Sequence, residues 1–201
     1  MITSTSSSQV KHVVNLQKKA KLRKEEKQFV VEGVKMVSEA PADRLVKVYV
    51  SETFKADNEE FLERMNYDSI GKDVLEIVTD NVFMRMADTQ TPQGIMAVVR
   101  MSDTDLEGIL SDKHNPLLLI IENLQDPGNL GTIVRMAEGA GVTGIIMSSN
   151  TVDIYNPKTI RSTMGSLYRV PVIYVDDICE AADVCLSLIH ISEPTRPERI
   201  S

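Results

Sequence analysis

The continuous apolar stretch at residues 116–121 places the strongest constraint on how this chain folds. A run of this kind, with no polar alternation, is typical of a strand that is buried on both faces of a parallel sheet. Further apolar strands are predicted at 144–147 and 170–175, and helices at 130–140 and 157–168. Because strand and helix alternate, the second half of the chain is expected to form a parallel sheet with right-handed crossovers.

The first hundred residues predict a smaller α/β unit, in which extended segments alternate with amphipathic ones and end in turn-forming residues. Strands are predicted at 29–33, 46–50, 74–78 and 94–99, and helices near 10–16, 34–40 and 58–65. The expected organisation is a polar leader at 1–9, a first domain at 10–100, a linker at 101–115 and a second domain at 116–185.

The net charge of −7 conceals a marked asymmetry along the 201 residues. Residues 1–35 hold eight basic and three acidic side chains and carry +5, whereas the remaining 166 residues carry −12. A basic arm on an acidic body suits local contact with phosphates, although the same pattern is also typical of a solvated helix face. The candidates for phosphate contact are Lys18, Lys19, Lys21, Arg23 and Lys24.

The composition excludes several classes of protein. An apolar content of 42% and a charged content of 25% are those of a globular chain. No apolar run reaches the roughly 18–20 residues that cross a bilayer, and the first residues lack the pattern of a secretory signal. Two cysteines, Cys179 and Cys185, predict neither a disulfide framework nor a metal site, and they indicate a reducing cytoplasm.

The polar loop after the apolar run opens a helix and carries the clearest chemical signal. It follows a predicted parallel strand, at the edge where α/β sheets bind ligands. Asn129 can cap the helix, while Gly128 and Gly131 allow a ligand to approach the backbone. Arg135 stands beside an apolar face, where a guanidinium either extends to solvent or binds a phosphate or substrate. The glycine spacing excludes a dinucleotide-binding fingerprint.

A second cluster surrounds the start of the next predicted helix. Pro157 occupies a position that is typical of a first helical residue. Lys158 and Arg161 are three residues apart and therefore share a helix face, with Ser162 beside them. Two cations at a helix start can hold a phosphate, and they can equally be ordinary surface charges.

Together, the two clusters resemble the SpoU/TrmH family of RNA ribose methyltransferases. Residues 126–131 with Arg135 are similar to the family's first motif, and residues 158–171 are similar to its second. Upstream, the segments 29–33 and 91–94 resemble the ends of the substrate-binding domain that precedes the catalytic domain in many members. The resemblance therefore extends over both predicted domains.

The resemblance implies transfer of a methyl group from S-adenosylmethionine to a ribose 2′-hydroxyl of ribosomal or transfer RNA. It also implies an RNA substrate-binding domain before a parallel-sheet methyltransferase domain with a trefoil knot, and a homodimer. By position, Asn129 and Arg135 match catalytic residues of the family, and Ser148 and Ser149 are expected near the cofactor. Expected RNA contacts in this domain are Lys158, Arg161 and Ser162. Since a guanidinium stays protonated, an electrostatic role is favoured for Arg135 over that of a base.

The C-terminal residues depart from the family's pattern. Residues 186–201 resemble a translated sequencing adapter rather than the family's third motif, and a natural polar tail is the alternative. If the segment is an adapter, the methyltransferase domain is incomplete. The 201-residue chain is then expected to be unknotted, poorly stable and unable to bind adenosylmethionine tightly, and the activity belongs to its parent protein. A non-catalytic RNA-binding module is the competing hypothesis, and sequencing the 3′ end of the gene distinguishes the two.

Overall fold

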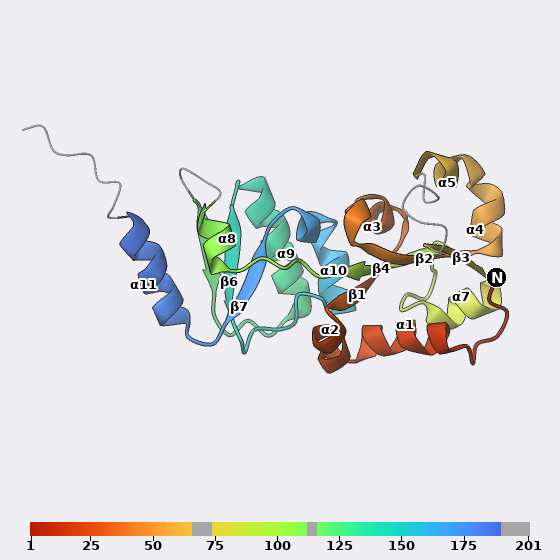
Figure 1. The fold of residues 1–201 in the computed structure, drawn as a ribbon, viewed down its shortest axis with the longest axis horizontal. Helices are drawn as coiled ribbons and strands as arrows, with labels where there is room; N and C mark the ends of the chain where they lie inside the picture. The colour runs from red at the N-terminus through yellow and green to blue at the C-terminus, as the bar shows by residue number, and fades with distance from the viewer. Residues whose placement is uncertain (66–73, 112–115, 190–201) are drawn as a thin grey trace, which may run out of the picture.

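The computed structural model describes residues 1–65, 74–111 and 116–189 of the chain. A four-stranded sheet and a three-stranded sheet follow one another along the long axis of the molecule, each flanked by helices (Figure 1). The α/β class and the parallel second sheet predicted from the sequence are confirmed. None of the helices in the described ranges combines the length and apolar character needed to span a bilayer.

The first sheet is mixed and has the strand order β1-β4-β2-β3. Its strands are β1 (Gln28–Glu32), β2 (Leu45–Ser51), β3 (Leu75–Val78) and β4 (Ile95–Arg100). β4 pairs antiparallel with β1 and β2, whereas β2 and β3 run parallel. All four strands lie where the apolar alternation predicts them.

One face of this sheet is covered by α1 (Ser8–Lys18) and α7 (Asp80–Met86), and the short helix α2 (Ala20–Glu26) continues from α1. Apolar side chains of α1 and α7 recur at helical spacing and pack on alternate residues of the strands. The buried residues of this cluster are Val10, Val13, Leu16, Val30, Tyr49, Val78, Val82, Phe83, Met86, Met96 and Val98. The basic arm is therefore folded onto the sheet.

The opposite face is covered by α3 (Val34–Ser38), α4 (Glu52–Asp57) and α5 (Glu59–Met65). The apolar pattern of the sequence does not indicate α4 or α7. Both helices begin after a residue whose hydroxyl caps them, Ser51 and Thr79. Helices of six and seven residues contain too few apolar positions for a helical period to be seen, so the capping residue is the signal that was available.

The second sheet is parallel throughout and has the order β5-β6-β7. Its strands are β5 (Leu118–Ile121), β6 (Gly144–Ser148) and β7 (Val172–Val175). Every residue of the central strand β6 is buried. Among the described residues, β5 lies at the edge of the sheet and Ile120 is 41% exposed, so the prediction that the run at 116–121 is buried on both faces is wrong in this structure. A continuous apolar run indicates a strand of a parallel sheet but not its place in the order.

Helices cover both faces of this sheet as well. α9 (Pro127–Gly139) and α10 (Pro157–Thr163) pack on one face, and α8 (Leu106–Ser111) and α11 (Ile178–Ile189) pack on the other. The first residues of the predicted tail at 186–201 continue α11, and the rest of that tail lies outside the described residues.

The predicted linker at 101–115 contributes to the second sheet. Within it, Ile109 of α8 is 3% exposed and lies over Gly144, where a Cβ would collide with the isoleucine side chain. Residues 112–115 lie outside the described residues. Part of the predicted linker therefore belongs to the core of the second sheet.

The predicted polar leader at 1–9 is attached to the fold rather than frayed. Ile2 forms a parallel bridge with Val78, and its N–H donates to the carbonyl of Ile77 at 2.8 Å. Its own carbonyl accepts the N–H of Thr79 at 3.1 Å, and α1 already begins within this range. The composition of this segment, rich in serine and threonine, does not indicate that it pairs with β3, because a single apolar residue, Ile2, forms the bridge.

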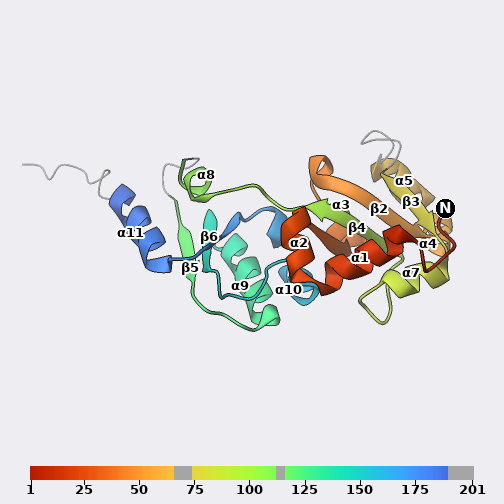
Figure 2. The same cartoon turned by 60° about the horizontal axis from the view of Figure 1, so that its bottom comes forward.

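The two sheets share one cluster of buried apolar residues. The rings of Phe29 in β1 and Tyr155 before α10 have their centroids 4.6 Å apart. The hydroxyl of Tyr168 donates to the carbonyl of Met36 at 2.9 Å. The junction of α1 and α2 lies beside α10 (Figures 1 and 2), so the basic arm reaches the second half of the molecule.

Candidate functional site

Both motifs singled out in the sequence begin at the carboxyl edge of the second sheet. α9 begins at Pro127 and α10 at Pro157, each after a strand of this sheet. Asp126 caps α9, and its Oδ1 accepts the N–H of Asn129 at 2.7 Å. The prediction that Asn129 is the cap is wrong, because a proline in the first helical position makes the preceding residue the cap. Asn156 caps α10 in the same way.

The helices α9 and α10 run side by side, and Gly131 lies where they meet. A Cβ on Gly131 would lie 2.6 Å from the carbonyl oxygen of Thr159, and closer still to Ser162. The prediction that Gly131 makes room for a ligand is therefore wrong, because it makes room for α10. Farther along, the hydroxyl of Ser166 donates to the carboxylate of Glu138. The fold thus brings the two motifs together.

α10 ends earlier than the helix predicted at 157–168. Met164 and Gly165 have φ values of 53° and 98°, which place both residues in the left-handed region and terminate the helix. A 3-10 turn, Ser166–Tyr168, then leads toward β7.

Arg135 and Asn129, the two residues predicted to be catalytic, both expose their side chains on α9. Arg135 stands four residues after Gly131 and three before Glu138, so it shares the side of the helix that runs along α10. Neither side chain makes a hydrogen bond or ion pair within the described part of the chain. Both polar groups are therefore open to a ligand.

The three predicted RNA-contact residues of α10 are engaged to different degrees. Lys158 Nζ lies 4.0 Å from a carboxylate oxygen of Asp126, and both side chains are exposed. Arg161 forms a 2.6 Å ion pair with Asp88 of the first unit. The hydroxyl of Ser162 donates to the carbonyl of Lys158 at 3.0 Å. Among these three, Lys158 has the cation most readily released to a phosphate.

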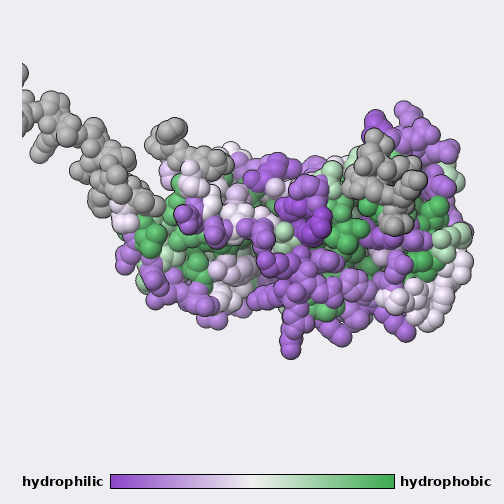
Figure 3. Space-filling view, in the orientation of Figure 1, coloured by the Kyte–Doolittle hydropathy of each residue, from purple (hydrophilic) through white to green (hydrophobic). Residues whose placement is uncertain are grey.

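Four lysines of the basic arm form an exposed group at the junction of α1 and α2, here called the lysine corner. Its members are Lys18, Lys19, Lys21 and Lys24. Lys24 Nζ lies 5.9 Å from the centre of the Tyr174 ring, and Lys21 lies 3.8 Å from Glu25. Figure 3 shows hydrophilic side chains gathered over α2 and the adjoining end of α1. Exposed ion pairs and cation–π contacts are weak, so the corner can accept phosphates.

Arg23 does not belong to this surface, and its prediction as an RNA contact is wrong. The side chain is 3% exposed, and its Nη2 lies 2.6 Å from a carboxylate oxygen of Asp153. The partner is 130 residues away in the sequence, so a local charge pattern could not reveal the burial.

Ser148 and Ser149, the predicted cofactor residues, end β6 and begin the loop after it. The Oγ of Ser148 is buried, accepts the N–H of Asn123 at 2.9 Å and lies 3.1 Å from the hydroxyl of Thr151. Ser149 is exposed, and its N–H donates to the carbonyl of Val175. The hydroxyl of Ser148 is thus committed to the fold. The hydroxyl of Ser149 makes no hydrogen bond within the described part of the chain and is therefore open to a ligand.

The segments 29–33 and 91–94, which carried the resemblance upstream, meet in space. Glu32 accepts hydrogen bonds from the backbone N–H of Asp88 and from the hydroxyl of Thr89. Gln93 Oε1 accepts the N–H of Val34 at 2.7 Å. Both polar side chains therefore bind their neighbouring loops, and their role is to hold the first sheet together.

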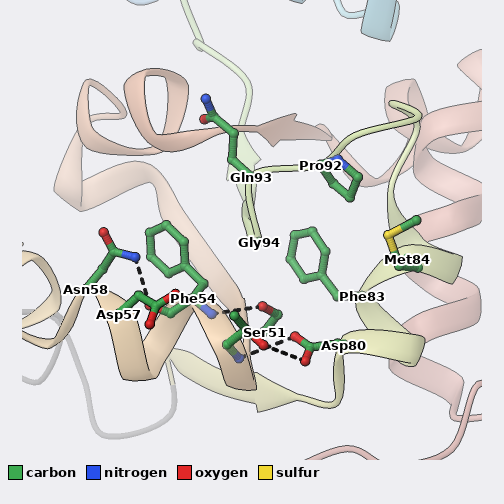
Figure 4. A pocket seen from close by; sticks show the side chains of 11 residues that line it. Ser51, Phe54, Asp57, Asn58, Asp80, Phe83, Met84, Pro92, Gln93 and Gly94 are labelled. Carbon is green, nitrogen blue, oxygen red and sulfur yellow. Dashed lines mark hydrogen bonds between the residues drawn. The ribbon is translucent and has the colours of Figure 1, made fainter.

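A cavity of about 320 Å³ in the first unit lies between α4 and α7 (Figure 4). It is lined by Ser51, Thr53, Phe54, Asp57, Asn58, Asp80, Phe83, Met84, Pro92, Gln93 and Gly94. Hydrogen bonds from Thr53 and Ser51 lower the pKa of Asp80, so the carboxylate stays ionised. With two carboxylates and no basic side chain in its lining, this cavity repels phosphates. Phosphate contact is expected at the lysine corner instead.

The described residues contain neither a candidate metal site nor a disulfide. These residues contain no group of histidine, cysteine, aspartate and glutamate side chains that could hold a metal ion. Cys179 is free and exposed, and Cys185 is free and buried.

The carboxylate of Glu138 gives a test of the contact between α9 and the turn that follows α10. Hydrogen bonds from Arg169 and then Ser166 hold its pKa below the ordinary value of 4.5. Because the folded-state pKa is lowered, this stabilisation is present above the unfolded pKa and is lost as the pH falls through the folded pKa. We expect Glu138→Gln to lower the free energy of unfolding at neutral pH, by an amount that shrinks as the pH falls below 4.5.

Urea denaturation across this pH range measures the effect. Glu63→Gln is the control, because Glu63 is exposed and has no ion pair among the described residues. A difference between Glu138→Gln and the unsubstituted protein that stays constant down to about pH 3 would contradict the assignment.

A mixed sheet followed by a parallel sheet, with free polar groups near the carboxyl edge of the second, defines a two-part α/β protein built to bind a ligand there. The family described as the SpoU rRNA Methylase family matches residues 116–191, and the MRM3-like substrate binding domain matches residues 7–97. Together the two matches span most of the chain, and they confirm the resemblance to the SpoU/TrmH family.

Similar proteins agree with this assignment. The chain is 32% identical over 170 residues to rRNA methyltransferase 3, mitochondrial, of Homo sapiens. The aligned region covers 80% of this chain and 38% of that protein. It is 35% identical over 108 residues to the 23S rRNA (guanosine(2553)-2′-O)-methyltransferase RlmP of Bacillus subtilis, over 51% of this chain and 41% of that protein.

Among solved structures, the AdoMet bound rRNA methyltransferase from Sinorhizobium meliloti superimposes with a TM-score of 0.75 at 25% identity, over 90% of this chain and 67% of that one. The chain spans 38–39% of the length of the first curated relatives that it matches.

Proposed function

We propose that the protein to which this chain belongs transfers a methyl group from S-adenosylmethionine to a ribose 2′-hydroxyl of ribosomal RNA. One observation carries the proposal: within the segment matched by the SpoU family, Asn129 and Arg135 are exposed and unpaired among the described residues. On the same helix, Glu138 accepts the hydroxyl of Ser166, whereas Asn129 and Arg135 keep their polar groups available to a ligand. The printed names of the relatives favour ribosomal over transfer RNA.

Arg135 and Asn129 have distinct proposed roles. When bound, S-adenosylmethionine would supply the electrophilic methyl group and keep the electron pair of the broken carbon–sulfur bond, and the ribose hydroxyl proton would pass to water. A guanidinium cannot act as a base at ordinary pH, so Arg135 stabilises the negative charge that develops on the ribose oxygen and holds the neighbouring phosphate. The amide of Asn129 can donate to and accept from the same ribose, which orients it for transfer. Ser149 is the proposed cofactor contact of the described residues.

The two sheets belong to units with different proposed functions. We propose that residues 10–100 form the RNA substrate-binding domain, 101–115 the connection and 116–185 an incomplete catalytic domain; the knot is expected of the parent protein. A homodimer is proposed for the parent protein, supported by the exposed side chains of Leu117, Ile120 and Leu186 at one end of the molecule. The cytoplasm is the proposed compartment, with the mitochondrion as the alternative that the human relative's name suggests.

Methyl transfer tests the proposal directly. Ribosomal RNA and, in a parallel reaction, transfer RNA are incubated with tritiated S-adenosylmethionine and with the protein that the complete reading frame encodes. We expect label in nucleotides that resist alkaline hydrolysis, because a 2′-O-methyl group blocks cleavage of the adjacent phosphodiester. Label in transfer RNA alone would mean that the substrate is transfer RNA and not ribosomal RNA. RNA binding with no transferred label would overturn the proposal in favour of the non-catalytic RNA-binding module.

The lysine corner gives a prediction on binding. Replacing Lys18, Lys19, Lys21 and Lys24 together by glutamine should weaken the binding of all RNAs. The slope of log affinity against log salt should flatten by roughly 3, since each lost phosphate contact removes about 0.7–0.9. Filter binding over a range of potassium chloride concentrations measures both. Lys35→Gln with Lys55→Gln, two exposed lysines outside the corner, is the control. An unchanged slope in the quadruple variant would remove the corner from the interface.

A further inference from the structure

Arg23 is buried in a setting that its sequence neighbours do not explain. Its Nη1 donates to the carbonyls of Leu16 and Gln17 at 2.7 and 2.9 Å. Its Nε and Nη2 donate to one carboxylate oxygen of Asp153 at 3.0 and 2.6 Å. The side chain of Asp153 is itself only 16% exposed. The guanidinium therefore has protein partners on both of its sides.

These partners belong to different parts of the molecule. Leu16 and Gln17 lie in the last turn of α1, where backbone carbonyls have no partner within the helix. Asp153 lies in the loop between β6 and α10, where its other carboxylate oxygen accepts the N–H of Tyr155 at 2.9 Å and its carbonyl accepts the hydroxyl of Thr159 at 3.3 Å. That loop begins with the proposed cofactor contact and ends at the cap of α10.

A buried ion pair fixes geometry more than it adds stability. The cost of removing both charges from water offsets most of their attraction, and apolar residues of similar volume are often at least as stabilising. The guanidinium is always charged and donates in a rigid planar fork, which admits few relative orientations of its partners. Apolar packing in the same place would impose no such orientation.

The other ion pairs between the two units do not hold the lysine corner in place. Arg161 pairs with Asp88, and Arg169 pairs with Glu39, both at 2.6 Å and both with exposed or half-buried side chains. Neither pair involves α2. The contact of Lys24 with Tyr174 does, but it is exposed and long. Among the described residues, the ion pair that joins α2 to the second unit is that of Arg23 with Asp153.

We propose that Arg23 and Asp153 are a positioning pair, which fixes the lysine corner relative to the loop between β6 and α10 and thereby relative to Arg135. On the proposed function, RNA phosphates held by the corner are then presented at a constant distance from the group that acts on the ribose. The basic arm therefore holds the bound phosphates at a fixed distance from Arg135. It selects folded RNA, in which the phosphate-to-ribose distance is also constant.

Distances between spin labels test the pair without RNA or cofactor. One label replaces the exposed Ala20 of α2, and another replaces the exposed Met136 of α9, with Cys179→Ser as the background. The test variant is Arg23→Met with Asp153→Leu, which leaves no buried charge without a partner. We expect the distance distribution from Ala20 to Met136 to broaden to about twice its width, as for a segment released from a rigid body.

A second label pair is the matched control. Ser38 of α3 is exposed and belongs to the first unit, and its distance to Met136 is expected to stay unchanged in the test variant. If the Ala20–Met136 distribution is unaltered, the ion pair contributes only to stability. If both distributions broaden, the substitutions loosen the whole fold. Either result overturns the proposal. If the double variant does not fold, Arg23→Gln with Asp153→Asn is measured in the same way, since it also leaves no buried charge and keeps both side chains polar and similar in size. Failure of methyl transfer would leave these distances unaffected, so the two proposals are tested separately.

Discussion

Replacing Gly131 by alanine is expected to destabilise the fold by about 2 kcal/mol, within the range for overpacking. The added Cβ would lie 2.6 Å from the carbonyl oxygen of Thr159, a backbone atom that cannot move unless α10 moves with it. Alanine favours a helix over glycine by about 1 kcal/mol, so the steric cost must exceed this gain. Urea denaturation measures the net effect as a lower transition midpoint.

Gly139 in the same helix is the matched control. Apart from its chain neighbours and the backbone of its own helix, no heavy atom lies within 4 Å of the position that its Cβ would occupy. Gly139→Ala should therefore be neutral, or stabilising by up to about 1 kcal/mol. Equal stability of the two variants would show that α9 and α10 do not meet as described, and would separate Arg135 from the motif on α10.

The sequence predicted the elements of both sheets because their strands carry their own signal. The alternation of Val46, Val48 and Val50 marks β2, and the proline at the start of α10 marks that helix. The same proline rule, applied to Pro127, would have identified Asp126 rather than Asn129 as the cap of α9.

Other features depend on partners that are remote in the sequence. Arg23 differs from the neighbouring lysines only in meeting Asp153, 130 residues later. Gly131 was expected to face a ligand because the sequence does not show that α10 occupies that side. Ile120 was expected to be buried because an apolar run does not state whether its strand is central or at an edge. Local patterns thus predict elements, whereas tertiary contacts decide which polar groups remain free.

Arg135→Lys, made in the protein that the complete reading frame encodes, is expected to lower the rate of methyl transfer by about 10²–10³, the loss typical of one removed donor to a developing oxyanion. Affinity for RNA should change little, because lysine keeps the positive charge that attracts phosphates. What lysine lacks is the planar fork that can reach the ribose oxygen and the phosphate together. Single-turnover rates with saturating RNA, and filter binding of the same RNA, measure the two quantities separately.

Arg85→Lys is the matched control for this substitution. Arg85 is an exposed arginine near the end of α7 and has no ion pair among the described residues, so the same chemical change there should leave both rate and affinity unaltered. Near-normal turnover of Arg135→Lys with normal RNA affinity would remove Arg135 from the chemistry. Weaker binding with a normal rate at saturation would restrict it to holding the phosphate. Only a loss of rate at constant affinity assigns the guanidinium to the charge on the ribose oxygen, because that charge exists in the transition state and not in the bound RNA.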